Sequence, residues 1–339
     1  MEHKKTLGSL IKWVIILALL AFGFISNREF MHEAFLEIKN TPNIKLILIF
    51  LMSNFYFIAE GIIIHMMTGE DEKALTIFQG ISCSYMCAFY RLATLGSGNG
   101  IAQIYYYKTK GIDVSKGTGM AIVQYTFQKI TIGIMGILAF LILIAFGNSD
   151  LLKYSWFMLA GVLVISIICT VLFLLTVSKK ISVFAITLIR TIIKKESRLT
   201  KKVDKLEHAI NSLQTEGRII WHDKKVFLLV VLLDIFKFCC WYIIPGILFV
   251  DNFDLNPLMC MALMAVCNML GCVMVAPSGI GTLDFVFALF FRALVKNGKA
   301  IAAAILIYRF FTWAVPFMIG LIPAAFLKKT NKDKEDIKE

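Results

Sequence analysis

The chain has 339 residues, of which 58% are hydrophobic and 17% charged, and its mean hydropathy is +0.76. Average soluble domains are about 45–50% apolar and about 25% charged, so a soluble fold of this size could not cover so much apolar surface. The composition therefore excludes soluble, disordered and disulfide-framework proteins and predicts a polytopic membrane protein. The net charge of +12 predicts a basic cytoplasmic face against an anionic membrane surface.

Long apolar runs recur along the chain and predict an all-α integral membrane protein with about seven to nine transmembrane helices. The first run is too long for the apolar part of a signal peptide and has no small-x-small cleavage site after it, so we expect a retained span. We expect a membrane domain over residues 1–327 and a charged cytoplasmic tail over 328–339. The runs are Leu7–Ile25, Ile44–Met67, Leu75–Leu95, Thr118–Gly147, Leu152–Val177, Val226–Val250, Pro257–Ala276, Ile280–Val295 and Ala300–Leu327.

The distribution of Lys and Arg predicts the topology. If every run crossed once from a cytoplasmic N-terminus, the basic segment Ser178–Lys225 would lie outside. If Leu75–Lys108 instead enters and returns as a hairpin broken at Gly96–Gly100, the cytoplasmic loops hold 23 basic residues and the outer loops 7. The hairpin topology, with both termini cytoplasmic, is therefore preferred.

The same argument predicts a second hairpin from Pro257 to about Val295, broken at Pro277–Gly281 and entering from the outside. Two glycine-broken hairpins of opposite orientation are typical of an inverted repeat, in which the broken helices mark the transport site. The breaks could also be tight turns between ordinary spans, and the sequence leaves open whether the hairpins are re-entrant.

The cytoplasmic basic segment 178–225 predicts amphipathic helices. One apolar stripe contains Ile181, Phe184, Leu188 and Ile192, and a second contains Leu199, Val203, Leu206, Ile210 and Leu213. These helices could lie in the headgroup layer or pack on the ends of the bundle.

The sequence contains no pattern for a metal site or for catalysis. The eight cysteines lie in apolar runs without zinc-ligand spacing, and the histidines are scattered. No nucleophile triad, phosphate-binding loop or nucleic-acid module is recognisable, so we expect no metal, no cofactor and no direct contact with nucleic acid.

Ionisable residues inside spans are costly and are therefore candidates for function. Asp234 and Lys237 are three residues apart on one helix and are expected to form a structural ion pair. Glu60 lies inside a span, where it could pair with an arginine or bind a proton, and Asp284 follows a helix start that favours a carboxylate. Arg91, Lys129 and Arg309 are the candidate anion-binding set, together with the helix starts at Gly98, Gly100, Gly279 and Gly281.

Two stretches resemble the flippase-like membrane domain of lysylphosphatidylglycerol synthases, the multiple peptide resistance factors. The first, Leu92–Gly117, has a glycine-rich break, Gln103-Ile-Tyr-Tyr, a basic pair and Gly-Ile-Asp-Val-Ser. The second, Ala276–Asp284, is similar to the family's Pro-Gly-Gly-x-Gly-x-x-Glu, and Tyr308-Arg309 followed by Pro316 is similar to its final span. Asp284 replaces the usual glutamate, and Asn99 stands where the family has glycine.

The resemblance implies translocation of phosphatidylglycerol or its aminoacyl derivative across a bacterial plasma membrane, and a link to cationic peptide and antibiotic resistance. It places Gln103 among the substrate-binding residues. The alternative is a phosphatidylglycerol lysyltransferase, or its membrane subunit acting with a separate tRNA-dependent transferase, because no transferase domain is recognisable after the last span. A third alternative is a scaffold that recruits a partner through the basic segment, and self-association is left open.

Overall fold

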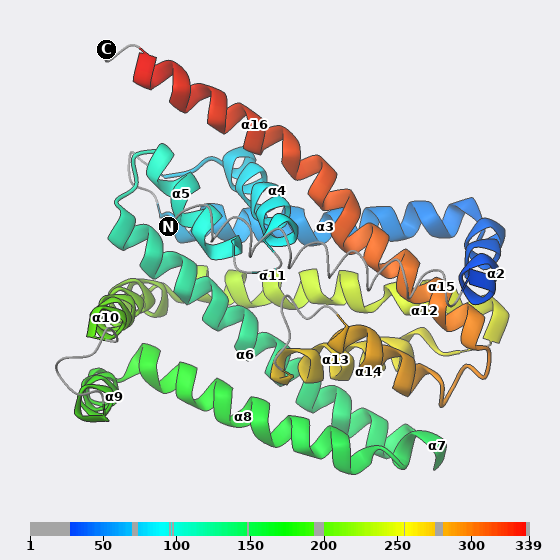
Figure 1. Cartoon of the computed structure of the whole chain (residues 1–339). Coiled ribbons are helices and arrows are strands. Elements are labelled where there is room, and N and C mark those ends of the chain that lie inside the picture. The colour runs from blue at the N-terminus through cyan, green and yellow to red at the C-terminus, as the bar shows by residue number, and fades with distance from the viewer. Residues whose placement is uncertain are drawn as a thin grey trace, which may run out of the picture.

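The computed structural model describes residues 28–69, 74–94, 96, 98–147, 149–192, 200–253, 255–274 and 281–336, and the regular elements in these ranges are helices (Figure 1). Within them, five helices are long and apolar enough to cross a membrane. The predicted span Leu7–Ile25 lies outside the described residues. The five are α3 (Asn43–Met67), α6 (Val114–Phe146), α8 (Ser155–Val177) and the continuous stretches Lys224–Asp251 and Gly298–Leu327.

Each glycine-rich break separates two shorter helices. The first hairpin consists of α4 (Ile77–Ala93) and α5 (Asn99–Thr109), and the second of α13 (Pro257–Val273) and α14 (Thr282–Phe291). The longest of these helices has 17 residues, which is about 25 Å at 1.5 Å per residue, against a hydrocarbon core of about 30 Å. These lengths favour hairpins that enter the membrane and return.

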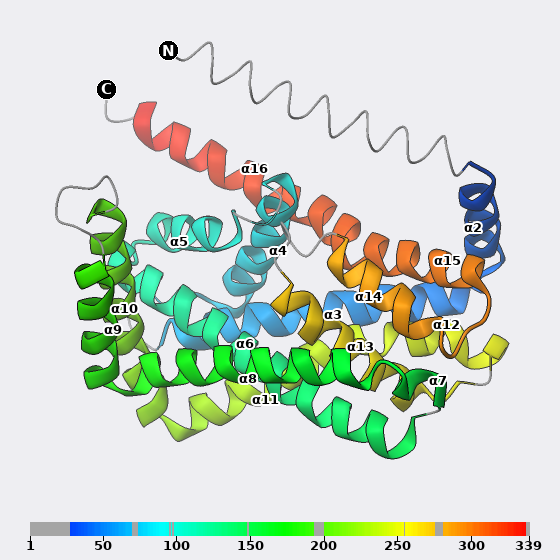
Figure 2. The same cartoon turned by 60° about the horizontal axis from the view of Figure 1, so that its bottom comes forward.

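The order of span, hairpin and span occurs twice. The first set is α3, the α4–α5 hairpin and α6; the second is α11 (Lys224–Tyr242) with α12 (Ile244–Phe253), the α13–α14 hairpin, and α15 (Gly298–Arg309) with α16 (Val315–Asp336). The first hairpin joins α3 and α6 at the end of the bundle that carries α9 and α10. The second joins α12 and α15 at the opposite end, near α2 (Arg28–Asn40) and α7 (Ser149–Leu152) (Figures 1 and 2).

Glycines allow the hairpin helices to approach their neighbours closely. A Cβ on Gly80 of α4 would lie 2.2 Å from the carbonyl oxygen of Gly61 of α3, and one on Gly320 of α16 would lie 2.0 Å from that of Tyr85. On the second hairpin, Met269 and Leu270 of α13 pack on Gly136 of α6 and Gly161 of α8. Small residues at helix crossings allow this close packing, which is common inside membranes.

The basic segment forms α9 (Lys179–Ile192) and α10 (Thr200–His222) at one end of the bundle (Figure 2). Ile210 and Leu213 of α10 are buried, so this part of α10 packs on the bundle. Gln214 donates a hydrogen bond of 2.6 Å to Ser182 and joins α10 to α9. Phe184 of α9 is 68% exposed, which is compatible with contact to lipid.

Candidate functional site

A polar cavity of about 330 Å³ lies between α3, α4, α5 and α6. The helices around it are otherwise mainly apolar, so the polar residues that line the cavity are candidates for function. Its polar and charged lining residues include Glu60, Arg91, Asn99, Gln103, Gln124 and Gln128.

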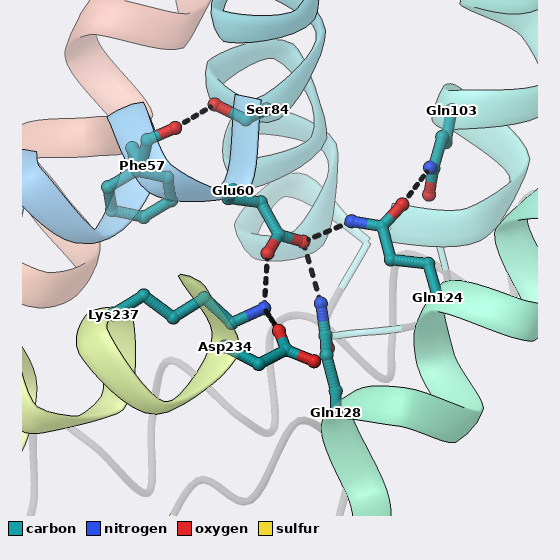
Figure 3. A network of polar contacts seen from close by, with 8 residues as sticks. All are labelled: Phe57, Glu60, Ser84, Gln103, Gln124, Gln128, Asp234 and Lys237. Carbon is teal, nitrogen blue, oxygen red and sulfur yellow. Dashed lines mark hydrogen bonds and ion pairs between the residues drawn. The ribbon is translucent and has the colours of Figure 1, made fainter. Parts of the chain in front are cut away.

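Glu60 of α3 is the centre of a hydrogen-bond network beside this cavity (Figure 3). Its Oε1 accepts hydrogen bonds of 2.7 Å from the side-chain amides of Gln124 and Gln128, which are one turn apart on α6. Gln103 of α5 donates to Gln124 at 2.6 Å and to the hydroxyl of Tyr107 at 2.8 Å. The network therefore fixes α5 and α6 to the middle of α3.

The other oxygen of Glu60 binds Lys237 of α11, with Nζ 2.5 Å from Oε2. Lys237 is fully buried and also forms an ion pair with Asp234 on its own helix, so a single ammonium group lies between two carboxylates (Figure 3). The side chain of Asp234 is 1% exposed, and Lys237 is its one polar partner among the described residues. The Asp234–Lys237 pair expected from the sequence is thus part of a three-residue cluster that also contains Glu60.

Arg91 lies at the end of α4, just before the break in the first hairpin, and lines the cavity. Its guanidinium carbon is 5.8 Å from the ring centre of Trp241 and 5.3 Å from that of Trp313, in cation–π geometry. Its buried Nε has no hydrogen-bond partner among the described residues. A buried donor without a partner is unfavourable, so this guanidinium is suited to an added anionic acceptor.

Arg309 has a carboxylate partner. Its Nε lies 2.7 Å from Oδ1 of Asp284, and one terminal nitrogen lies 3.0 Å from Oδ2. Asp284 also accepts a hydrogen bond of 3.1 Å from the amide of Gly281, and this bond caps the N-terminus of α14. Gly281 has a φ of 84°, a conformation that glycine adopts without strain. Asp284 therefore holds the tip of the second hairpin against the last span.

The first hairpin contacts the last span at Trp313. Its ring contacts Arg91 from the first hairpin and also Arg309, whose guanidinium carbon is 4.5 Å from the ring centre. Trp313 lies in the π-helix Phe310–Ala314 between α15 and α16, and Ser53 of α3 donates a hydrogen bond to the Phe311 carbonyl there. A π-helix in a long span is frequent at functional sites.

The other predicted anion-binding residues are only partly brought together. Gly100 and Gln103 line the cavity, whereas the amide of Gly98 donates to the Thr94 hydroxyl and that of Gly281 to Asp284. These two amides are therefore occupied within the chain. Gly279 lies outside the described residues.

Lys129 does not converge with the arginines in the described part of the chain. Its ammonium lies 5.2 Å from the ring centre of Tyr125 and close to the thiol of Cys272 on α13, and it is not among the residues that line the cavity.

Sequence reasoning missed Gln124 and Gln128, which bind Glu60 from α6. The signal was present: two glutamines at positions i and i+4 in an apolar run share one face of a helix, and that face must find polar partners. It also missed Trp313, because an aromatic residue in an apolar span does not stand out by composition.

The fold and this site define a polytopic α-helical membrane protein with two broken hairpins and a polar cavity beside the first of them. The chain belongs to the family of the lysylphosphatidylglycerol synthase transmembrane region, whose model matches residues 7–320. A sequence search among curated proteins found no match. Family membership supports a lipid-related function in a membrane.

Proposed function

We propose that the chain translocates an anionic phospholipid between the leaflets of a bacterial plasma membrane, with phosphatidylglycerol or its aminoacyl derivative as the substrate. The observation that carries the proposal is Arg91, a half-buried arginine beside the break of the first hairpin, whose buried Nε has no partner among the described residues. A lipid phosphate is the simplest ligand for it, because arginine binds phosphate through two hydrogen bonds.

Two grooves support a lipid as the substrate, since each offers space for acyl chains beside one hairpin. One, of about 620 Å³, lies between α6, α11 and α13 and is lined mainly by apolar side chains such as Leu138 and Met259. The other, of about 590 Å³, lies between α4, α5 and α16 and has Lys110 and Tyr106 among its lining residues.

In this proposal the residues have separate roles. Arg91 binds the phosphate, while Gln103 and the backbone at Gly100 line the path of the headgroup. Arg309 and Asp284 hold the second hairpin in place, and Glu60 supplies negative charge that could attract a cationic headgroup. The termini and the α9–α10 segment face the cytoplasm, where basic residues meet anionic lipid.

The family description favours one second candidate, in which the chain is the membrane part of an enzyme that aminoacylates phosphatidylglycerol. Mass spectrometry of the purified protein tests the first candidate. We expect phosphatidylglycerol or an aminoacyl derivative to copurify with the wild type and to be depleted at least several-fold in Arg91→Gln. Equal lipid content in both proteins would contradict the assignment of Arg91, and copurification of a transferase without lipid would favour the second candidate.

A further inference from the structure

The ionised side chains around the cavity balance in number. Glu60 and Asp234 supply two negative charges, and Lys237 and Arg91 supply two positive charges. Lys237 contacts both carboxylates, and Arg91 lines the same cavity as Glu60. The site is therefore neutral as a whole in the absence of a ligand.

A bound phosphate would upset this balance. A lipid phosphodiester adds one negative charge, and an uncompensated charge is strongly unfavourable in a low-dielectric site within a membrane. Restoring neutrality requires one positive charge from outside, and a proton is the smallest cation that can reach a buried carboxylate.

We propose that the Glu60–Lys237–Asp234 cluster takes up one proton for each anionic lipid that binds at Arg91, and that Asp234 holds this proton. The inference rests on the proposed function and adds to it a chemical coupling between lipid and proton. In the step itself a hydronium ion of the surrounding solution transfers a proton to one oxygen of the Asp234 carboxylate and becomes water, and no other covalent bond of the protein changes.

Asp234 rather than Glu60 is the acceptor because the two carboxylates have different partners. Glu60 accepts hydrogen bonds from Gln124, Gln128 and Lys237, all of which stabilise the ionised form. Asp234 has Lys237 as its one polar partner among the described residues, and its side chain is 1% exposed. Protonation of Asp234 therefore weakens one contact, whereas protonation of Glu60 would disturb three.

The cavity provides the route for the proton. Glu60 lines the cavity with a side chain that is 15% exposed, and Lys237 connects it to Asp234. In the described residues, the other ionisable groups near the cluster and the cavity are tyrosines and cysteines, which are neutral near pH 7 and leave the balance unchanged. They are Tyr56, Cys83, Cys87, Tyr107 and Tyr125. The neighbouring face of α6 contributes Gln124 and Gln128, which do not ionise.

Calorimetric titration of the full chain with a short-chain phosphatidylglycerol tests the coupling. Titrations at one pH in buffers of different ionisation enthalpy report the protons taken up per lipid. We expect about one proton for the wild type, with the affinity falling about tenfold per pH unit where uptake is complete. Asp234→Asn should bind the lipid with no proton uptake and with little dependence on pH, because the amide imitates the protonated acid.

The matched control is Asp150→Asn, which changes an exposed aspartate on α7 that pairs with Lys153 and should behave as the wild type. Glu60→Gln also removes one negative charge and should abolish uptake, so it carries the test if Asp234→Asn does not fold. Binding without proton uptake in the wild type, or uptake that persists in both variants, would overturn the inference and leave the proposed function intact. If the wild type does not bind phosphatidylglycerol at all, both proposals fail.

Discussion

Asp284 and Arg309 form a two-point ion pair that joins the tip of the second hairpin to the last span, with contacts of 2.7 and 3.0 Å. Arg91, at the tip of the first hairpin, contacts the same tryptophan, but its Nε has no partner among the described residues. The two arginines thus differ in role. Arg309 is paired with a carboxylate of the chain itself, whereas Arg91 can bind an anionic ligand.

The Asp284–Arg309 pair should contribute measurably to stability. A double-mutant cycle of Asp284→Asn and Arg309→Gln, followed by unfolding in mixed micelles, should give a coupling free energy of about 0.5–3 kcal/mol. The pair is partly buried: the side chain of Arg309 is 18% exposed and that of Asp284 is 29% exposed. Water therefore screens it less than a surface pair. The exposed pair Asp150–Lys153 is the control and should show no measurable coupling. Equal behaviour of the two pairs would contradict the structural role.

Trp313 should stabilise the contact between the first hairpin and the last span through both arginines. Trp313→Leu removes two cation–π contacts of about 0.5–2 kcal/mol each, so we expect it to lower the free energy of unfolding by about 1–4 kcal/mol. Trp313→Phe keeps an aromatic face and should lose less. Trp156→Leu is the control, because Trp156 is 80% exposed and should tolerate the change. A Trp313→Leu protein as stable as the Trp156→Leu control would contradict the stabilising role of Trp313.

The close crossing of α3 and α4 makes a further prediction about glycine. Gly80→Ala places a methyl group 2.2 Å from the Gly61 carbonyl oxygen, so the helices must separate, at a cost of about 1–3 kcal/mol. Gly100→Ala is the matched control, since Gly100 is also helical but has open space around it. Thermal unfolding in detergent should show a lower midpoint for Gly80→Ala only. A wild-type midpoint for Gly80→Ala would contradict the close contact between α3 and α4.

The topology can be tested with single added cysteines. Lys180→Cys on α9 and Ser149→Cys on α7 lie on opposite ends of the bundle. A membrane-impermeant thiol reagent applied to intact cells should label the cysteine at 149 and reach the one at 180 only after permeabilisation. The unmodified chain provides the background, because its eight cysteines are buried or partly buried. Labelling in the reverse order would invert the orientation.

Much of the fold could be predicted from the sequence, because hydropathy and glycine breaks are local signals. The runs Ile44–Met67 and Leu152–Val177 correspond closely to α3 and α8, and the break at Gly96–Gly100 separates α4 from α5. The runs at Leu75–Leu95 and Pro257–Ala276 form arms of the two expected hairpins, and their helices are shorter than the long spans.

The site could be predicted only where its partners are neighbours in the chain. Asp234 and Lys237 are three residues apart, so helical geometry suggests their contact. Glu60 and Lys237 are 177 residues apart, and the rotation of two helices about their axes decides whether they meet. The pairing of Arg309 with Asp284 depends in the same way on how deeply the second hairpin enters the bundle.

The most direct test of the central claim is leaflet exchange in liposomes that contain the purified protein. A fluorescent phosphatidylglycerol in the inner leaflet becomes accessible to a membrane-impermeant quencher only after it moves to the outer leaflet. The wild type should exchange this lipid well above the rate in protein-free vesicles. Arg91→Gln should reduce the exchange at least tenfold while folding normally. Arg292→Gln, which changes an exposed arginine at the end of α14, should retain the wild-type rate. Wild-type exchange no faster than in protein-free vesicles, for phosphatidylglycerol and for its lysyl ester, would contradict the account.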